Sequence, residues 1–120
     1  MGRVVWVEDD PTIRKLVDAA LRSSGHELQF ASNGQEGLAL VERMHPDIVF
    51  TDVSMPLMDG LELADAIRAR PALGDVRIVF VTASMQREQI DRYTKRGATF
   101  IAKPFSTAEL RAHLKRLVSA

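Results

Sequence analysis

Asp52 is the residue of this sequence that is best placed for chemistry. It directly follows the apolar run at residues 47–51, and it opens a loop that ends in Asp59-Gly60. The run predicts a buried strand, and a carboxylate just beyond such a strand is poorly placed for burial. In parallel α/β sheets, ligands bind outside the carboxyl ends of the strands. Asp52 is therefore a candidate reactive or ligand-binding residue.

Three further apolar segments are followed directly by polar side chains: residues 3–7 by Glu8 and Asp9, residues 76–81 by Thr82, and residues 98–102 by Lys103. The carboxyl ends of parallel strands meet at one edge of a sheet. If the four segments are such strands, carboxylates, a hydroxyl and an ammonium group gather around Asp52. Because all four apolar segments are followed by a polar or charged side chain, we predict a functional site at that edge.

The composition predicts one ordinary globular domain over residues 1–120. The chain has 46% hydrophobic and 27% charged residues, and its length is near the commonest domain size. Its apolar stretches are too short for a membrane span, and no basic, apolar leader opens the chain. We therefore expect a cytoplasmic protein without a membrane partner. The absence of cysteine excludes disulfides, thiol catalysis and thiolate metal sites.

Charge is unevenly distributed although the formal net charge is zero. Residues 1–84 carry 8 Lys and Arg against 13 Asp and Glu, whereas residues 85–120 carry 8 against 3. The basic part can complement helix C-termini and solvate a surface, or it can form a docking face for an acidic partner; both interpretations stay open. The neutral total disfavours nucleic acid as the main ligand.

Helical periodicity alternates with the apolar runs and predicts five helices. The expected buried faces are Ile13, Leu16, Val17, Ala20 and Leu21; Leu38, Val41 and Met44; Leu61, Ala64 and Ile67; a less amphipathic stretch around Ile90 and Tyr93; and Leu110, Leu114, Leu117 and Val118. A short strand is expected at residues 28–31, and Ser106 with Glu109 predicts a capping box before the last helix. The order of elements is (βα)₅.

Continuous apolar runs are typical of parallel strands that are buried on both faces. Residues 4–7, 48–50 and 78–81 have this character. We therefore expect a three-layer αβα sandwich of the α/β class. Trp6 adds bulk to the first run and is expected to lie in the core.

The residues described above resemble the receiver domain of two-component response regulators, such as the bacterial chemotaxis regulator, over the whole chain. The resemblance rests on Glu8-Asp9, Asp52, Met55-Pro56, Asp59-Gly60, Thr82-Ala83 and Lys103-Pro104-Phe105. The order of these motifs also fits, with 43 residues from Asp9 to Asp52, 30 more to Thr82 and 21 more to Lys103. The resemblance implies a doubly wound, flavodoxin-like fold with a five-stranded parallel sheet of order 2-1-3-4-5.

The resemblance also implies that Asp52 accepts a phosphoryl group from a phosphohistidine on a sensor histidine kinase or a histidine phosphotransfer protein. It implies an Mg²⁺ cofactor held by Asp9, Asp52 and the backbone carbonyl of Ser54, with Glu8 acting through water. The chemistry is consistent, because clustered carboxylates repel one another unless they share a cation. Asp10, which precedes Pro11, is expected to cap the first helix instead.

In the family pattern Lys103 and Thr82 contact phosphoryl oxygens, and the Lys103-Pro104 bond is expected to be cis. Thr82 and Phe100 correspond to the two residues that the family uses as a switch: the threonine moves toward the phosphoryl group and the aromatic side chain fills the space that this opens. Phe100 can also be a static core residue. Phosphorylation would shift the surface formed by helix 4, strand 5 and helix 5, which is the expected face for a downstream protein target. We expect no direct binding of nucleic acid, and we expect a phosphoacceptor rather than an enzyme.

Two other functional classes remain. A binding module that works without phosphorylation would keep the fold but would be expected to have lost an acid, the threonine or the lysine. A hydrolase or nucleotide enzyme could use the same scaffold, but the chain lacks phosphate-binding glycine loops and a nucleophile-elbow serine. The histidines His26, His45 and His113 show no metal-ligand spacing. A stand-alone receiver and a piece of a longer regulator or hybrid kinase fit the sequence equally well.

Overall fold

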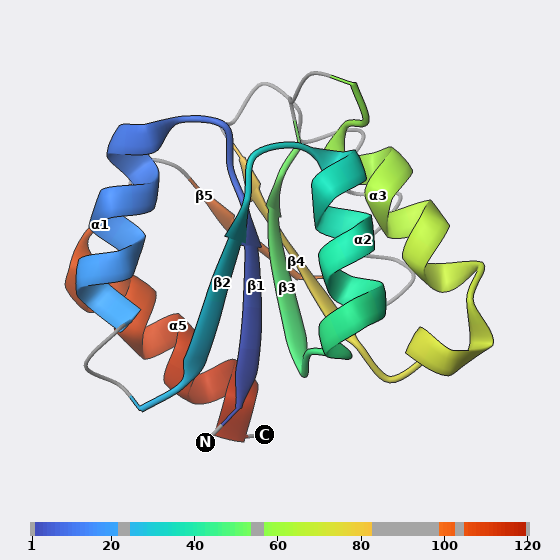
Figure 1. Ribbon diagram of the computed structural model, residues 1–120. Coiled ribbons are helices and arrows are strands. Elements are labelled where there is room, and N and C mark those ends of the chain that lie inside the picture. Colours follow the sequence, from blue (N-terminus) through green and yellow to red (C-terminus); the bar gives the residue numbers. More distant parts are fainter. Residues whose placement is uncertain (1, 22–24, 54–56, 83–98, 103–104, 120) are drawn as a thin grey trace.

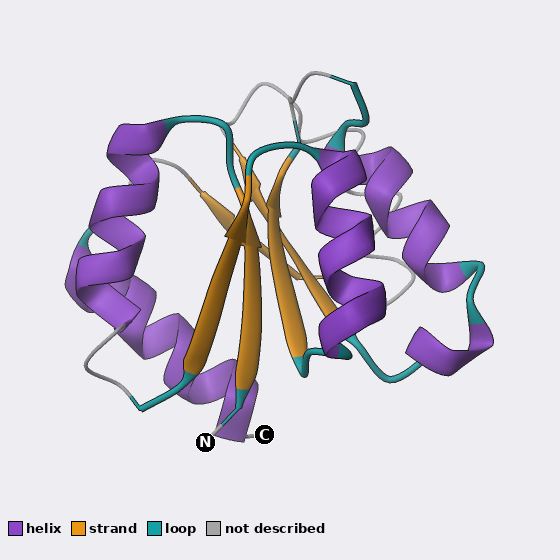
Figure 2. Cartoon of the chain, in the orientation of Figure 1, coloured by secondary structure: helices purple, strands orange, loops and turns teal. Residues whose placement is uncertain are grey.

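Five parallel strands form one sheet in the computed structural model of the chain, which describes residues 2–21, 25–53, 57–82, 99–102 and 105–119. The strands are β1 (Arg3–Val7), β2 (Glu27–Ala31), β3 (Ile48–Asp52), β4 (Arg77–Thr82) and β5 (Thr99–Ala102). Their order across the sheet is β2-β1-β3-β4-β5, which is the order expected. Figure 2 shows the strands side by side between two layers of helices.

Helices cover both faces of this sheet. The described helices are α1 (Pro11–Leu21), α2 (Gly34–Met44), α3 (Gly60–Arg68) and α5 (Thr107–Ser119), with a short 3₁₀ turn at Pro71–Leu73. The pair α1 and α5 lies on one face and the pair α2 and α3 on the other (Figure 1). The expected fourth helix falls outside the described residues. No helix in the described part of the chain is long and apolar enough to cross a membrane.

The core is divided by the sheet into two apolar clusters. The cluster on the α2–α3 side includes Val5, Val49 and Ile67, and the cluster on the α1–α5 side includes Trp6 and Phe50. Side chains of successive strand residues point to opposite faces, so a continuous apolar strand supplies both clusters. Trp6 is fully buried, as expected, and its ring stacks on that of Phe50 with 4.6 Å between the ring centroids.

Local capping signals define where the helices begin. The side chain of Asp10 accepts a hydrogen bond from the Thr12 amide at 2.9 Å, so its predicted role as a cap is confirmed. The amide of Glu109 donates to Ser106 Oγ, and the amide of Ser106 donates to the Glu109 carboxylate, each at 3.1 Å. These two bonds form the predicted capping box of α5.

The expected buried face of α1 is wrong at one position. Val17, Ala20 and Leu21 are fully buried, but Leu16 is 37% exposed. Successive helical residues are about 100° apart around the axis. Val17 and Leu21 are at the centre of the helix face that packs on the core, and Leu16 therefore lies at the margin of that face. In α2, similarly, Leu40 and Val41 are buried whereas the predicted Leu38 and Met44 are only partly buried.

Candidate functional site

Three acidic side chains meet at the carboxyl end of the central strands. Strands β1 and β3 are neighbours, with Val7 opposite Thr51, so Glu8 and Asp9 follow β1 where Asp52 ends β3. One carboxylate oxygen from each of the three residues lies within 4.8 Å of the other two. The sequence predicted this convergence, and the structure confirms it for these three residues.

The three acids differ in their environment. Glu8 is buried, Asp52 is half-buried and Asp9 is exposed. The amide of Glu8 donates to the carbonyl of Ala31 at 3.0 Å, which fixes the backbone of β1 beyond its last residue. The amide of Asp10 lies 3.4 Å from Glu8 Oε2. A buried carboxylate is unfavourable unless hydrogen bonds or a cation compensate it, so a site that brings Glu8 to Asp9 and Asp52 is suited to binding a cation.

The backbone around Asp52 is held by the start of α3. The amide of Gly60 donates to the carbonyl of Val53 at 2.9 Å, which closes the loop of residues 53–59. Thr51 Oγ1 donates to the carbonyl of Asp52 at 2.9 Å. Asp59 and Glu62 form a capping box at the first turn of α3. The sequence indicated Asp59-Gly60 as a motif, but it did not show that Gly60 closes this loop.

The backbone of β4 brings one more predicted residue to the same end of the sheet. Asp52 is opposite Val81, and Thr82 is the last residue of β4, opposite Ala102. Thr82 therefore ends the strand next to Asp52. Phe100 is the second residue of the edge strand β5 and lies opposite Phe80. The structure describes only the backbone of Thr82 and Phe100, so the contacts of both side chains stay predictions.

Three predicted features lie outside the described residues. They are the carbonyl of Ser54, the ammonium group of Lys103 and the expected cis bond between Lys103 and Pro104. Their predicted roles are untested. The lysine follows β5 directly in the sequence.

Comparison with known proteins agrees with this arrangement. The family model of the response regulator receiver domain matches residues 4–115. The chain belongs to the response regulator receiver domain family.

Two curated relatives illustrate the similarity of this receiver domain in sequence. It is 36% identical over 119 residues to the transcriptional regulatory protein PdtaR of Mycobacterium tuberculosis, covering 98% of this chain and 57% of that protein. It is 29% identical to the DNA-binding dual master transcriptional regulator RpaA of Synechocystis, covering 98% of this chain and 49% of that protein. The chain spans about half the length of the curated relatives it matches.

Solved structures show the same fold. The chemotaxis protein CheY4 of Vibrio cholerae superposes with a TM-score of 0.88 at 31% identity, covering 98% of both chains. The receiver domain of the sensor histidine kinase PA1611 from Pseudomonas aeruginosa has a TM-score of 0.87 at 28% identity, covering 99% of this chain and 98% of that one. That structure has a magnesium ion coordinated in its active-site cleft.

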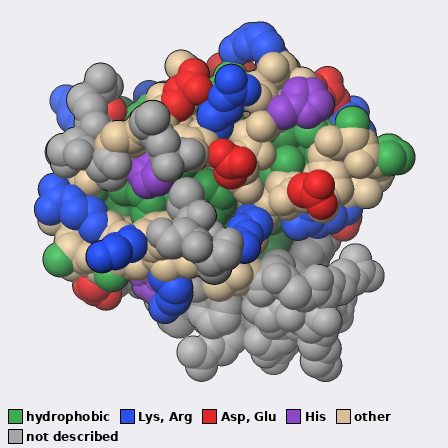
Figure 3. Space-filling model, turned by 90° about the horizontal axis from the view of Figure 1, so that it is seen from below, with side chains coloured by type: hydrophobic (Ala, Val, Ile, Leu, Met, Phe, Trp, Pro, Cys, Tyr) green, Lys and Arg blue, Asp and Glu red, His purple; other side chains and the backbone are tan. Residues whose placement is uncertain are grey.

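The opposite end of the receiver domain carries an open polar hollow. It has a volume of about 590 Å³ and is lined by Gly2, Arg3, Gly25, His26, Glu27, His45 and Asp47. Seen from this end, acidic, basic and histidine side chains are interspersed among the described residues (Figure 3). Over the described part of this face, therefore, charges of both signs are mixed.

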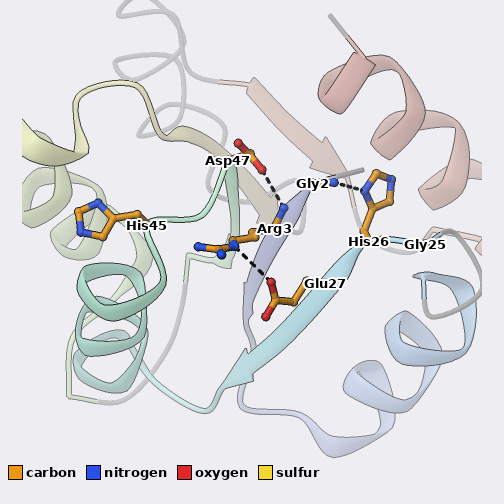
Figure 4. Close-up of a pocket in the computed structure, with 7 residues that line it drawn as sticks. All are labelled: Gly2, Arg3, Gly25, His26, Glu27, His45 and Asp47. Carbon is orange, nitrogen blue, oxygen red and sulfur yellow. Dashed lines mark hydrogen bonds and ion pairs between the residues drawn. The ribbon is translucent and has the colours of Figure 1, made fainter.

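The histidines of this hollow do not form a metal site. The Gly2 amide donates to His26 Nδ1 at 2.9 Å, so that nitrogen is already engaged as an acceptor. His26 and His45 lie on opposite sides of Arg3, whose amide donates to Asp47 at 2.8 Å and whose guanidinium pairs with Glu27 (Figure 4). Among the described residues, the only group with metal-ligand geometry is Glu8, Asp9 and Asp52.

Proposed function

We propose that this receiver domain accepts a phosphoryl group on Asp52 from the phosphohistidine of a sensor histidine kinase or a histidine phosphotransfer protein. The cluster of Glu8, Asp9 and Asp52 carboxylates carries the proposal. Family membership supports it, and so does the position of Asp52 as the last residue of β3. Ligand sites of doubly wound sheets lie at this end of the strands.

The proposed step is one displacement at phosphorus. A carboxylate oxygen of Asp52 attacks and the phosphorus–nitrogen bond of the phosphohistidine breaks. The imidazole, whose other ring nitrogen carries a proton, leaves with the electron pair and is then neutral. The product is an acyl phosphate on Asp52. Such transfer depends mainly on positioning and on stabilising the charge of the equatorial oxygens, so the geometry around Asp52 matters more than acid–base groups.

The acidic cluster fits Mg²⁺ as the cofactor. Two oxygens that share Mg²⁺ at about 2.1 Å lie up to about 4.2 Å apart, which is compatible with three carboxylate oxygens within 4.8 Å of one another. Asp9 and Asp52 would bind directly, with the backbone carbonyl of Ser54, and Glu8 would act through water. Bound Mg²⁺ would neutralise charge on the phosphoryl oxygens. The related PA1611 receiver domain, which coordinates magnesium, supports this assignment.

Two further residues would contact the transferred group. Lys103 would donate from its ammonium group to one phosphoryl oxygen, a role in which lysine acts as a point charge. The hydroxyl of Thr82, the last residue of β4, would donate to another. Movement of Thr82 toward the phosphoryl group would be linked to Phe100, and the surface of helix 4, strand 5 and helix 5 would present the signal to a downstream protein.

In this proposal the domain is a phosphoacceptor in a signalling reaction and not an enzyme that turns over a separate substrate. A phosphoryl group can shift the conformational balance only by its differential stabilisation of two states. Two of the curated relatives are named as transcriptional regulators, and the chain matches about half of their length. The expectation that residues 1–120 do not themselves bind nucleic acid therefore remains a prediction about this domain alone.

Mass spectrometry tests the proposal. The native chain, Asp52→Asn and Asp47→Asn are each incubated with Mg²⁺ and a small acyl phosphate, and the intact masses are compared with and without a chelator. Asp47 is a matched control because it is an exposed aspartate at the other end of β3. We expect a gain of one phosphoryl group in the native chain and in Asp47→Asn when Mg²⁺ is present. An equal gain in Asp52→Asn would mean that another residue accepts the phosphoryl group, and no gain in the native chain would favour a phosphorylation-independent module. Either result would contradict the proposal.

A further inference from the structure

The first turn of α2 is in direct contact with the loop that follows β3. A Cβ atom on Gly34 would lie 2.3 Å from the carbonyl oxygen of Met58, and 2.7 and 2.8 Å from Met58 Cβ and Cγ. The nearest of these atoms belongs to the backbone and has no rotamer by which to move away. Only glycine allows this approach, so Gly34 determines how closely α2 lies against the loop.

The described residues of that loop are anchored next to Asp52. Its two ends are joined by the 2.9 Å hydrogen bond from the Gly60 amide to the Val53 carbonyl. Leu57, within the loop, has a φ of 69°, a left-handed conformation that is unfavourable for residues other than glycine. Strained backbone persists only where the surrounding structure holds it in place. Met58 is joined through Asp59 to Gly60, where a Cβ atom would lie 2.2 Å from the Asp52 carbonyl oxygen. A displacement of Met58 would therefore be transmitted through these residues to Asp52.

The start of α2 is itself rigid enough to act as a support. The side chain of Asn33 accepts from the Glu36 amide at 2.9 Å and donates to the Glu36 carboxylate at 2.9 Å. The Gly37 amide donates to the Asn33 carbonyl at 2.9 Å. The start of α2 and the loop before α3 lie at the same end of the sheet, the end where β3 finishes (Figure 1).

We propose that Gly34 is a positioning residue for the cation site. With glycine at this position, the first turn of α2 can lie against Met58 and hold residues 58–60 against Asp52 at the end of β3. The inference rests on the proposed function, because it concerns the Mg²⁺ site assigned to Glu8, Asp9 and Asp52. Coupling between two sites is reciprocal, so Mg²⁺ at the acidic cluster must in turn stabilise the first turn of α2.

The first test compares Mg²⁺ affinity and stability in three variants. In Gly34→Ala we expect the dissociation constant for Mg²⁺ to rise about 5-fold or more, the scale of coupling between linked sites. Gly74→Ala is the matched glycine control, because its new Cβ would meet only Pro71 O at 3.4 Å. Leu114→Ala destabilises the core on the α1–α5 side of the sheet, whereas α2 and α3 lie on the other side. In both controls the Mg²⁺ affinity should remain within about 2-fold of native, since neither substitution changes the linkage between α2 and the site.

The second test uses the native chain alone, so it does not depend on the folding of a variant. We expect saturating Mg²⁺ to slow hydrogen exchange of the Gly37 amide about 3-fold or more, by linkage, and to leave the His45 amide at the other end of α2 unchanged. Native Mg²⁺ affinity in Gly34→Ala, or Mg²⁺ binding without protection of the Gly37 amide, would overturn this inference and leave the proposed function standing. A native chain that binds no Mg²⁺ would overturn both.

Discussion

A Cβ atom on Gly60 would lie 2.2 Å from the backbone carbonyl oxygen of Asp52. The first residue of α3 and the last residue of β3 therefore touch through their backbones, with no room for a side chain between them. This contact joins the proposed phosphoacceptor to the helix that follows it. It explains why Gly60 stands at the start of α3, where alanine would have the higher helix propensity.

Replacing Gly60 by alanine should destabilise the fold despite that propensity. Overpacking of this kind costs about 1–3 kcal/mol, which exceeds the gain of about 1 kcal/mol from helix propensity. Urea unfolding of Gly60→Ala should give a lower midpoint with an unchanged slope. Gly74→Ala, where the new Cβ makes an ordinary contact, should unfold within about 0.5 kcal/mol of the native chain. A midpoint for Gly60→Ala equal to that of the control would show that the contact can relax freely.

His45 should be replaceable by glycine with a gain in stability. It is the exposed C-cap of α2, with a φ of 48° and a ψ of 62°, and glycine is favoured at this left-handed position. We expect His45→Gly to raise the free energy of unfolding by about 0.5–1 kcal/mol and His45→Ala to lower it. Thermal unfolding of the two variants side by side checks the prediction. Equal effects of glycine and alanine would mean that backbone strain at His45 is negligible.

Trp6 should tolerate phenylalanine far better than alanine. Its indole Nε1 is buried and has no hydrogen-bond partner among the residues that the structure describes, an arrangement that costs about 1–3 kcal/mol. Trp6→Phe removes this polar group and keeps an aromatic ring next to Phe50. The gain from removing the group offsets the cost of the smaller side chain, so we expect the free energy of unfolding to change by no more than about 1 kcal/mol. Trp6→Ala should cost about 3–5 kcal/mol. Chemical unfolding followed by circular dichroism distinguishes these outcomes, and similar losses in both variants would show that ring size alone governs the site.

Removing one charge from the acidic cluster should stabilise the chain when no cation is bound. Charges about 4 Å apart interact by about 1 kcal/mol in water, so Asp9→Asn in chelator should raise the free energy of unfolding by up to about that amount. Mg²⁺ should raise the melting temperature of the native chain, because a ligand of the folded state stabilises it. The same Mg²⁺ should have a smaller effect on Asp9→Asn. Asp75→Asn, an exposed aspartate outside the cluster, should respond to Mg²⁺ as the native chain does.

Features determined by neighbouring residues in the chain were well predicted from the sequence. The apolar run before Asp52 forms a buried strand, Asp10 caps α1, and Ser106 with Glu109 caps α5. Each depends on side-chain type and spacing within a few residues, which a sequence displays directly. Leu16 was predicted wrongly because periodicity identifies a helical stripe but does not show how wide the core beneath it is.

The sequence by itself determined which polar side chains stand at strand ends, because strand length and the change from apolar to polar residues are local properties. It did not determine, from the residues alone, which strands are neighbours. The tertiary structure decided that β1 lies beside β3, and this adjacency brings Glu8 and Asp9 to Asp52. It also decided that Gly34 lies against Met58. Such contacts depend on how separate elements pack, and packing is set by the whole core rather than by any segment of the chain.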